Sequence, residues 1–362
     1  MCTEEIYNCA KRCKRLRSRS ITKEWRSAGK NGQIVRPRKG YHMITLTPDT
    51  FALTRTFTIS RGSKTQAQVL TVRVTRGGVT GWGECVPYAR YGESLASVSE
   101  AILALPEGIT RQALQNALPA GAARNALDCA LWDLEAKASG LRAWQLAGLA
   151  SPAPVQIAYT LSLDTPEAMR ALAAQNAHRP LLKLKLGTPD DMPRLAAVRQ
   201  GAPKSRLIVD ANEGWTPEVY TALAPHLIRL GVAMVEQPLP AGADDMLAEI
   251  ARPLPVAADE SCHGAASLAG LMGKYDLVNL KLDKTGGLTE ALVAKAEAQR
   301  LGFGLMVGCM VGSSLAMAPA VLLAQGAQYC DLDGPLLLSQ DREVPLDYDA
   351  QGVHPPARAL WG

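Results

Sequence analysis

Between residues 183 and 281, one short apolar run after another ends in a lysine or an acidic residue. Counted from Lys185, the residues that end successive runs are 25, 26, 23 and 22 positions apart. A strand, a helix and two short loops use about this many residues, since a crossover between parallel strands takes at least ~10–12. Side chains with this period gather at one end of a parallel barrel, where barrels carry their active sites. They are Lys183, Lys185, Asp210, Glu236, Asp259 and Lys281. This convergence of charge predicts an enzyme.

A chain of 362 residues is long enough for two domains, one of them a barrel of roughly 200–250 residues. Its net charge of +5 is uneven: residues 1–40 hold 12 Lys and Arg against 3 Asp and Glu, so the remainder is mildly acidic. Residues 1–42 lack the apolar core of a secretory signal and sustain no apolar period. We therefore predict a basic, disordered extension there. A transit peptide, a nucleic-acid-binding arm and a start at Met43 are the alternatives.

Two further features bear on the compartment. The eight cysteines are scattered, and Cys9 and Cys13 have no second Cys/His pair, so we expect free thiols in a reducing cytoplasm. The stretch 301–324 carries no charge and is long enough for a membrane span, but it divides at Gly312 and contains Pro319. We interpret it as a buried strand, a glycine-rich loop and a buried helix. The sequence thus predicts a cytoplasmic protein with no membrane partner.

Residues 43–150 differ in pattern from the rest of the chain after them. Three strand-like alternating segments come first, and two segments with helical periodicity come next, the second ended by Gly140. Strands followed by helices predict a small α+β domain. The predicted strands are 56–60, 67–74 and 79–84, and the predicted helices are 94–105 and 122–138.

Over residues 151–335 the order is strictly strand, helix, strand, helix. Thr165, Thr188 and Thr216 each precede a proline and an acid, which predicts three helix starts with a capping hydroxyl and a proline at the first helical position. Eight such strands predict an α/β fold, a TIM-type (β/α) barrel. A doubly wound open sheet is the alternative, but no Gly-rich phosphate loop follows a first strand. Residues 336–362 are expected to return to the first domain. The predicted strands are 155–162, 181–186, 207–210, 233–236, 256–259, 277–282, 303–307 and 329–333.

Asp210, Glu236 and Asp259 end three consecutive predicted strands. Three hard oxygen ligands on adjacent strands suit Mg²⁺, one ion per subunit, with water and substrate in the other positions. A single acid at a strand end often caps the next helix, but three at a regular spacing favour a metal site. The sequence therefore predicts a magnesium centre at this end of the barrel.

The lysines supply candidate bases. Lys183 and Lys185 share one face of a strand, and their leucine neighbours favour burial over an exposed edge strand. Burial beside a second ammonium and a divalent cation lowers a lysine's pKa, which frees an amine to take a proton. Lys281 ends the sixth strand, across the barrel from the second. A base on each side of a carbon can remove a proton from one face and return it to the other. A hydrogen α to a carboxylate is weakly acidic, so a metal must stabilise the enediolate.

From about Met43 to the C-terminus the chain resembles the enolase superfamily, muconate-lactonizing subgroup. The motifs that carry the resemblance are Lys183-Leu-Lys185, Val-Asp210-Ala-Asn, Val-Glu236-Gln-Pro, Ala-Asp259-Glu-Ser and Asn-Leu-Lys281-Leu-Asp-Lys-Thr-Gly-Gly. The resemblance implies an N-terminal capping domain, Mg²⁺ held by the three acids, and the Lys bases known of enolase-superfamily sites. It assigns 1,1-proton transfer to Lys185 and Lys281, and contact with the substrate carboxylate to Lys183.

The motif Asp331-Leu-Asp333 limits the class of substrate that the site is expected to bind. Two carboxylates two apart on a strand share a face and can hold an ammonium group. The pair resembles the Asp-x-Asp of dipeptide epimerases, and the runs around Arg124, Cys309 and Asp331 are similar to bacterial L-Ala-D/L-Glu epimerases, which act on a murein-derived dipeptide. The resemblance implies that Thr160 and Cys309 line the substrate pocket. The side chain of a substrate glutamate needs a cation, for which the first domain offers Arg61 or Lys64.

Other functions are consistent with some of these residues. The same core serves β-elimination, as in o-succinylbenzoate synthase-like relatives, and cycloisomerisation. A binding protein with a basic leader is the alternative from another class, although we expect no nucleic-acid partner. The sequence leaves open a homo-oligomer, the breadth of dipeptide specificity and the role of residues 1–42.

Overall fold

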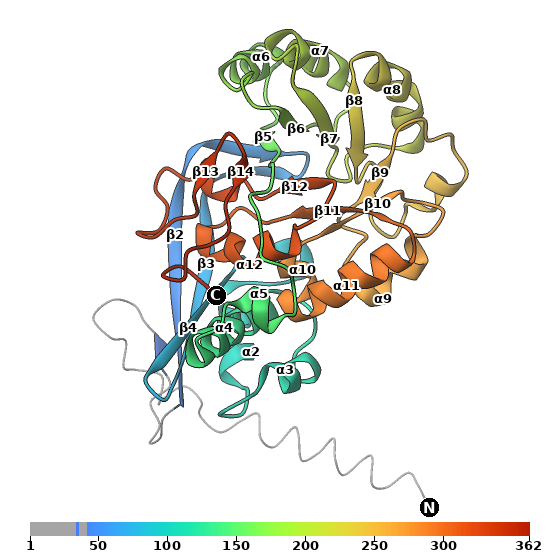
Figure 1. The fold of residues 1–362 in the computed structure, drawn as a ribbon. Coiled ribbons are helices and arrows are strands. Elements are labelled where there is room, and N and C mark those ends of the chain that lie inside the picture. Colours follow the sequence, from blue (N-terminus) through green and yellow to red (C-terminus); the bar gives the residue numbers. More distant parts are fainter. Residues whose placement is uncertain (1–33, 36–41) are drawn as a thin grey trace, which may run out of the picture.

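The computed structural model describes residues 34–35 and 42–362. The predicted basic extension, residues 1–42, therefore lies outside the described residues except for two parts. Ile34–Val35 form the two-residue strand β1, and His42 begins β2 (His42–Ile59), with which β1 pairs antiparallel. In the described part, an antiparallel sheet with short helices packs beside an eight-stranded parallel sheet wound as a barrel (Figure 1). The predicted fold class, a (β/α) barrel with an N-terminal α+β domain, is confirmed.

The N-terminal domain, or cap, is built on a long hairpin. Its sheet has the order β1-β2-β3-β4, with β3 at Gly62–Arg76 and β4 at Val79–Cys85. The predicted strand 56–60 covers only the end of β2. The pairing register shifts between Ala52 and Phe57, and such an irregularity breaks the alternation that marks a strand in sequence. The helical elements are η3 (Ala89–Tyr91), α2 (Leu95–Leu103), α3 (Arg111–Ala117), α4 (Ala122–Ser139) and α5 (Ala143–Leu146).

Helix α4 packs directly on β4 because two glycines of the strand leave room for it. A Cβ at Gly81 would collide with the carbonyl oxygen of Ala130, and one at Gly83 would collide with that of Ala126. This close approach buries one face of α4 in the core of the cap. Gly140, in the left-handed conformation with φ 77°, ends the helix as predicted.

The barrel consists of eight parallel strands in sequential order, β5 to β12. The first and last strands meet through a hydrogen bond of 2.7 Å from Ala158 N–H to the Cys330 carbonyl. The strands are β5 (Tyr159–Leu161), β6 (Leu181–Lys185), β7 (Arg206–Asp210), β8 (Val232–Glu236), β9 (Val256–Ala258), β10 (Leu277–Leu280), β11 (Gly304–Gly308) and β12 (Tyr329–Asp331). The crossovers carry α6 (Pro166–Gln175), α7 (Asp191–Gly201), α8 (Pro217–Arg229), η4 (Asp245–Ala248), α9 (Ala265–Leu268), η5 (Ala269–Leu271), α10 (Leu282–Thr285), α11 (Leu288–Arg300) and α12 (Ser314–Leu323).

Two of the three predicted helix starts are confirmed. The hydroxyls of Thr165 and Thr216 accept hydrogen bonds from the first turns of α6 and α8, and a proline follows each. The start at Thr188 is wrong, because α7 begins at Asp191. The Asp191 carboxylate accepts the backbone N–H of Thr188 at 2.8 Å and that of Gly187 at 2.7 Å, so an aspartate inside the helix closes this turn.

The strict alternation of strand and helix is also wrong at one crossover. Between β8 and β9 the chain forms only the 3₁₀ turn η4. Pro238, Pro240, Pro253 and Pro255 flank this segment, and prolines restrict both their own backbone and that of the residue before them. Helical backbone is confined to the residues between Gly242, which has φ 80°, and Pro253, and only the four residues of η4 form a helical turn there.

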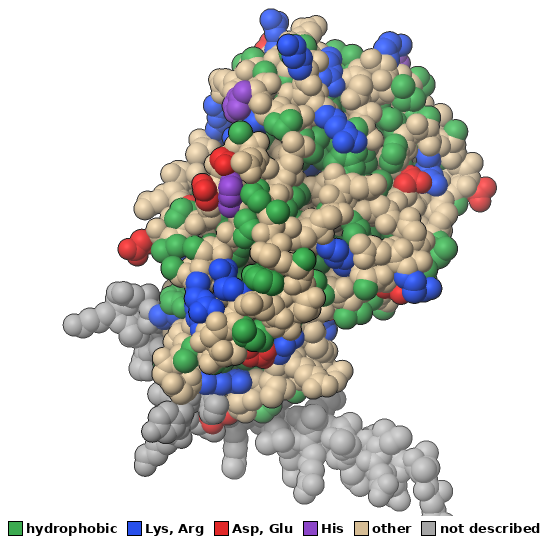
Figure 2. All heavy atoms as spheres, viewed as in Figure 1, with side chains coloured by type: hydrophobic (Ala, Val, Ile, Leu, Met, Phe, Trp, Pro, Cys, Tyr) green, Lys and Arg blue, Asp and Glu red, His purple; other side chains and the backbone are tan. Residues whose placement is uncertain are grey.

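The outer surface gives no sign of a membrane-spanning helix. None of the helices in the described residues is long and apolar enough to cross a bilayer, and the uncharged stretch 301–324 folds as β11, a loop and α12, as predicted. On the face shown in Figure 2, acidic and basic side chains are interspersed across the described part of the protein.

The C-terminal segment packs against the cap. After η6 (Gly334–Leu337), it forms the hairpin β13 (Tyr348–Asp349) and β14 (Gly352–Val353). Its last residues reach α4, where Trp361 is completely buried and donates its indole N–H to the Cys129 carbonyl at 3.0 Å. The backbone N–H of Gly362 donates to Asp133 at 2.7 Å. The chain end therefore ties the barrel to the cap.

Replacing this anchor should destabilise the protein strongly. We expect Trp361→Ala to lower the free energy of unfolding by about 3–5 kcal/mol, because it leaves a cavity and removes the partner of the Cys129 carbonyl. Urea unfolding followed by circular dichroism measures this. The matched control is Met272→Ala, at a side chain that is 54% exposed. Equal midpoints for the two variants would show that the C-terminal anchor contributes nothing.

Candidate active site

The charged residues predicted at strand ends lie at one end of the barrel. Strand register brings three of them together, because Lys185 on β6 pairs with Asp210 on β7, which pairs with Glu236 on β8. Asp259 and Lys281 directly follow β9 and β10. A one-residue slip in any of these strands would turn its charged side chain to the opposite face.

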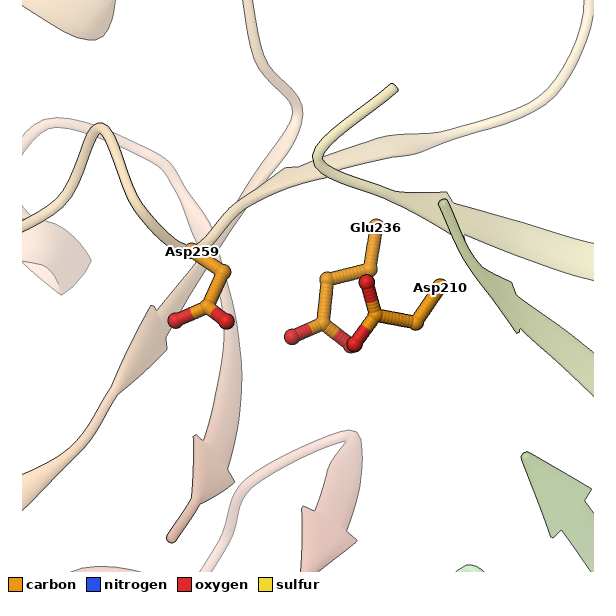
Figure 3. A group of neighbouring side chains, drawn as sticks. All are labelled: Asp210, Glu236 and Asp259. Carbon is orange, nitrogen blue, oxygen red and sulfur yellow. The ribbon is translucent and has the colours of Figure 1, made fainter. Parts of the chain in front are cut away.

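The three acids form a compact cluster. Asp210, Glu236 and Asp259 each offer a carboxylate oxygen, and these atoms lie within 4.8 Å of one another. Figure 3 shows the carboxylates directed into one common space from three neighbouring strand ends. All three residues are buried. Burial, with the neighbouring charge of Asp210 next in importance, raises the pKa of Glu236 to about 7.

This cluster fits a hard divalent cation. Glu236 Oε2 lies 2.6 Å from the Lys183 ammonium, yet it accepts no hydrogen bond of acceptable geometry. Three converging carboxylate oxygens, one of them incompletely satisfied and all shielded from water, match the oxygen ligands that Mg²⁺ prefers. The residues present are therefore suited to hold this ion.

Lysine ammonium groups surround the acids. Lys185 Nζ lies 2.6 Å from Asp210 Oδ2, and Lys281 Nζ lies 2.6 Å from Asp259 Oδ2. Burial lowers the pKa of Lys281, but nearby carboxylates, Asp259 first among them, outweigh burial and raise it well above its ordinary value. Strands β6 and β10 lie four strands apart in the eight-stranded barrel. The two lysines therefore face the barrel mouth from opposite walls.

Lys183 lies deeper than its neighbour. Its ammonium is completely buried, 2.6 Å from Glu236 and from Asp331 and 3.1 Å from Asp210. Burial lowers the pKa of Lys183, but these carboxylates outweigh burial and raise it well above its ordinary value. Three anions face this nitrogen, and the fall in pKa expected beside a second ammonium and a divalent cation stays a prediction. Lys183 supports the floor of the site, and its predicted contact with substrate stays a prediction.

A cavity of about 260 Å³ opens above this floor. Lys185, Lys281 and Asp259 line it, and so do the four residues that the sequence suggested for the substrate pocket. Those four are Thr160, Cys309, Asp331 and Asp333. The structure thus brings every residue proposed for the site to one cavity or to its floor.

The acid pair lies at one end of the cavity. The Thr160 backbone N–H donates to Asp333 at 2.6 Å, and its hydroxyl donates to Asp331 at 3.3 Å. Burial, followed by the charge of Asp331, raises the pKa of Asp333 to about 7. Two buried carboxylates that contact the same residue, Thr160, attract a cationic group.

Three polar residues near the acids were missed in the sequence. Lys284 Nζ lies 2.5 Å from Asp259 Oδ1, Asn279 donates to Glu236 at 2.7 Å, and Glu260 lines the cavity. Asn279 lies two residues before Lys281, so strand periodicity could have identified it. Lys284 lies on α10, beyond the strand, and strand periodicity gives no signal there.

The cap closes the cavity from above with Phe57, Arg61 and Lys64. Arg61 is bound to the barrel, 2.7 Å from Glu260 and 2.9 Å from Glu213. Burial, with the positive charge of Lys185 contributing, lowers the pKa of Lys64 to about 8. Within the described residues no carboxylate forms an ion pair with Lys64. The two candidate cations therefore differ in their partners.

Comparisons with known proteins agree with this geometry. Residues 43–148 match the mandelate racemase / muconate lactonizing enzyme N-terminal domain, and residues 164–347 match the enolase C-terminal domain-like family. The chain is 47% identical over 304 residues to the L-Ala-D/L-Glu epimerase of Escherichia coli, covering 82% of this chain and 95% of that protein. It is 49% identical to an N-acetyl-D-glutamate racemase of Pseudoalteromonas, covering 78% of this chain and 91% of that protein.

A solved structure shows the same architecture. It is an enolase family member from Agrobacterium tumefaciens with homology to dipeptide epimerases, with bound sodium and L-Ala-L-Glu. It is 54% identical, with a TM-score of 0.86, and the alignment covers 88% of this chain and 99% of that one. These relatives include an epimerase and a racemase, and both domain matches fall on the described fold. The chain therefore belongs to the enolase superfamily, in the mandelate racemase / muconate lactonizing enzyme group, and is an isomerase.

Proposed function

We propose that this protein is a Mg²⁺-dependent dipeptide epimerase that interconverts L-Ala-D-Glu and L-Ala-L-Glu. The observation that carries the proposal is one cavity lined by Lys185 and Lys281 from opposite walls and by the acid pair Asp331 and Asp333, with the carboxylate cluster at its floor. The L-Ala-D/L-Glu epimerase and the L-Ala-L-Glu complex among its relatives support this substrate.

The acid pair and the metal cluster fix the two ends of the peptide backbone. Asp331 and Asp333 accept the α-ammonium of the alanine residue, beside Thr160 and Cys309. Asp210, Glu236 and Asp259 would hold Mg²⁺, which when bound makes the α-hydrogen of the C-terminal residue more acidic by neutralising charge on its carboxylate. Holding both ends leaves the α-carbon between the two lysines.

Each lysine serves one face of that carbon. The amine of one takes the α-proton and becomes an ammonium, and the ammonium of the other then gives a proton to the opposite face of the planar enediolate. One lysine must therefore be neutral and the other charged at the start of each turnover. Because Asp259 raises the pKa of Lys281, its neutral form depends on neutralising that carboxylate's charge.

Arg61 and Lys64 differ in their ion pairs, and this difference supports Lys64 as the group that binds the glutamate side chain. Arg61 is engaged by Glu213 and Glu260, whereas Lys64 lines the cavity without an ion-paired carboxylate in the described residues. A substrate carboxylate entering the cavity would complete the coordination of Lys64 and raise its lowered pKa.

We also propose that the enzyme acts in the cytoplasm on peptides derived from murein. The five described cysteines are free, as expected of a reducing compartment.

N-acetylglutamate racemisation is a second candidate, because one relative is named for it. That substrate keeps the carboxylates of glutamate but replaces the alanine ammonium by an uncharged acetyl group. The acid pair therefore distinguishes the two functions, since only a dipeptide has a cation for Asp331 and Asp333 to bind.

Single substitutions of the lysines should separate the two proton transfers. We expect Lys185→Ala and Lys281→Ala each to lower epimerisation by roughly 10²–10⁴-fold, since each removes an acid/base group. In D₂O, each variant should still exchange the α-proton of one glutamate epimer, a different epimer for each variant, as followed by ¹H NMR. Lys204→Ala, on an exposed lysine, is the control. Retention of exchange with both epimers by either variant would contradict the two-base assignment.

Metal removal should abolish activity reversibly. Treatment with EDTA should stop epimerisation, and Mg²⁺ should restore it. Binding should also stabilise the fold, by about 2.7 kcal/mol at a hundredfold excess over the dissociation constant, which thermal unfolding measures. Glu236→Gln should remove most of this stabilisation, because one of three buried ligands loses its charge. A midpoint that does not respond to Mg²⁺ in the wild-type protein would refute the site.

The acid pair is tested by comparing two substrates. We expect Asp331→Asn and Asp333→Asn to lower kcat/KM for L-Ala-L-Glu by about 10–100-fold, since each loses a charge-assisted contact with the ammonium. Asp333→Asn should change activity toward N-acetyl-L-glutamate much less, whereas Asp331→Asn also removes a partner of Lys183 and should lower activity toward both substrates. If the wild-type protein turns over N-acetylglutamate rapidly but does not epimerise the dipeptide, the second proposal would replace the first.

A further inference from the structure

Two loops, one from each domain, meet beside the cavity. Ser60 Oγ and Arg61 Nη1 in the cap both donate to the carbonyl oxygen of Asn212 at 2.7 Å. Asn212 and the next residue, Glu213, have φ values of 44° and 68°, which residues other than glycine rarely adopt. A strained stretch of the barrel loop between β7 and α8 is thus kept where it touches the cap.

The carboxylate of Glu213 joins two separate segments of the cap. Arg61 lies 2.9 Å from Oε2, and Arg90 donates to both oxygens, at 3.0 Å from Nε and 2.8 Å from Nη2. The backbone N–H of Ala241 donates to Oε1 at 2.8 Å. Burial raises the pKa of Glu213, but the hydrogen bonds from Arg90 lead the contacts that outweigh burial and lower it. Every polar contact of the Glu213 carboxylate is charge-assisted, and the Glu213 side chain is only 7% exposed.

These contacts act at a short distance from the cavity. Glu213 does not line it, but Arg61 does, and Lys64 follows three residues later at the start of β3. The β2–β3 hairpin fixes the backbone of Lys64 relative to β2, because Ile59 pairs with Gly62 and Phe57 pairs with Lys64. Ion pairs from Arg61 to Glu213 and Glu260 hold this end of the hairpin against the barrel.

We propose that Glu213 is a positioning residue: through Arg61 and Arg90 it holds the end of the β2–β3 hairpin, with Lys64 on β3, over the cavity, and so sets the preference for an acidic C-terminal residue. This inference rests on the proposed function. It assigns Arg61 a structural partner in the barrel and leaves Lys64 as the contact with substrate. Loss of Glu213 should therefore weaken substrate binding more than it slows proton transfer.

The test compares Glu213→Gln with Glu297→Gln, an acid on α11 paired to an exposed arginine. We expect Glu213→Gln to raise KM for L-Ala-L-Glu about tenfold, as for one lost charge-assisted contact, with kcat changed by less than about threefold. Glu297→Gln should change neither. Arg90→Gln, which removes one of the two cap arginines from a partly exposed position, should raise KM in the same direction but less. Arg90→Gln therefore tests the same proposal if Glu213→Gln does not fold.

Combining Glu213→Gln with a substitution of Lys64 tests whether Glu213 affects substrate binding through Lys64. Calorimetric titration with L-Ala-L-Glu should show that Glu213→Gln weakens binding by less than about twofold in a Lys64→Met background. An equal weakening in both backgrounds, or a fall in kcat as large as the fall in kcat/KM, would overturn the positioning role. Absence of α-proton exchange in the wild-type protein would instead refute the proposed function.

Discussion

Three carboxylates held within 4.8 Å of one another and buried require positive charge close by. Asp210, Glu236 and Asp259 cannot all be ionised there without it, and the rise in the pKa of Glu236 to about 7 shows the cost. In the structure, lysine ammonium groups supply that charge, at distances of 2.5–3.1 Å. The same oxygens suit a divalent cation. The same carboxylate oxygens would therefore ligate the metal ion and pair with the lysine ammonium groups. This shared use links metal binding to the protonation of the lysines.

The cap completes a site that the barrel begins. The barrel supplies the floor and walls from strand ends, where register fixes each side chain, whereas the cap supplies the roof from the end of the β2–β3 hairpin, which belongs to a separate sheet. Ion pairs across the interface, with Arg61 between Glu213 and Glu260, compensate for that difference. In the proposed mechanism the chemistry resides on the barrel, and selection of the substrate side chain resides on the cap.

The sequence predicted the barrel and its charged strand ends because both depend on local periodicity. Short apolar runs that end in a charge, repeated at the length of a strand-helix unit, are typical of a (β/α) barrel and fit few other folds. The features that the sequence did not predict depend on contacts between distant residues. Lys284 reaches Asp259 from a short helix, and Arg61 meets Glu213 across 152 positions of sequence. The helix expected between β8 and β9 is wrong, because Gly242 takes a left-handed conformation and Pro253 follows closely, so only the turn η4 forms between them.

The proposed chemistry requires that Lys185 and Lys281 face one carbon from opposite sides while the three acids hold a cation at its carboxylate. A crystal structure of the protein with Mg²⁺ and L-Ala-D-Glu tests this requirement most directly. We expect the two Nζ atoms on opposite faces of the glutamate α-carbon, with Asp210, Glu236 and Asp259 all ligating the ion. Both nitrogens on one face, or an ion bound elsewhere, would contradict it.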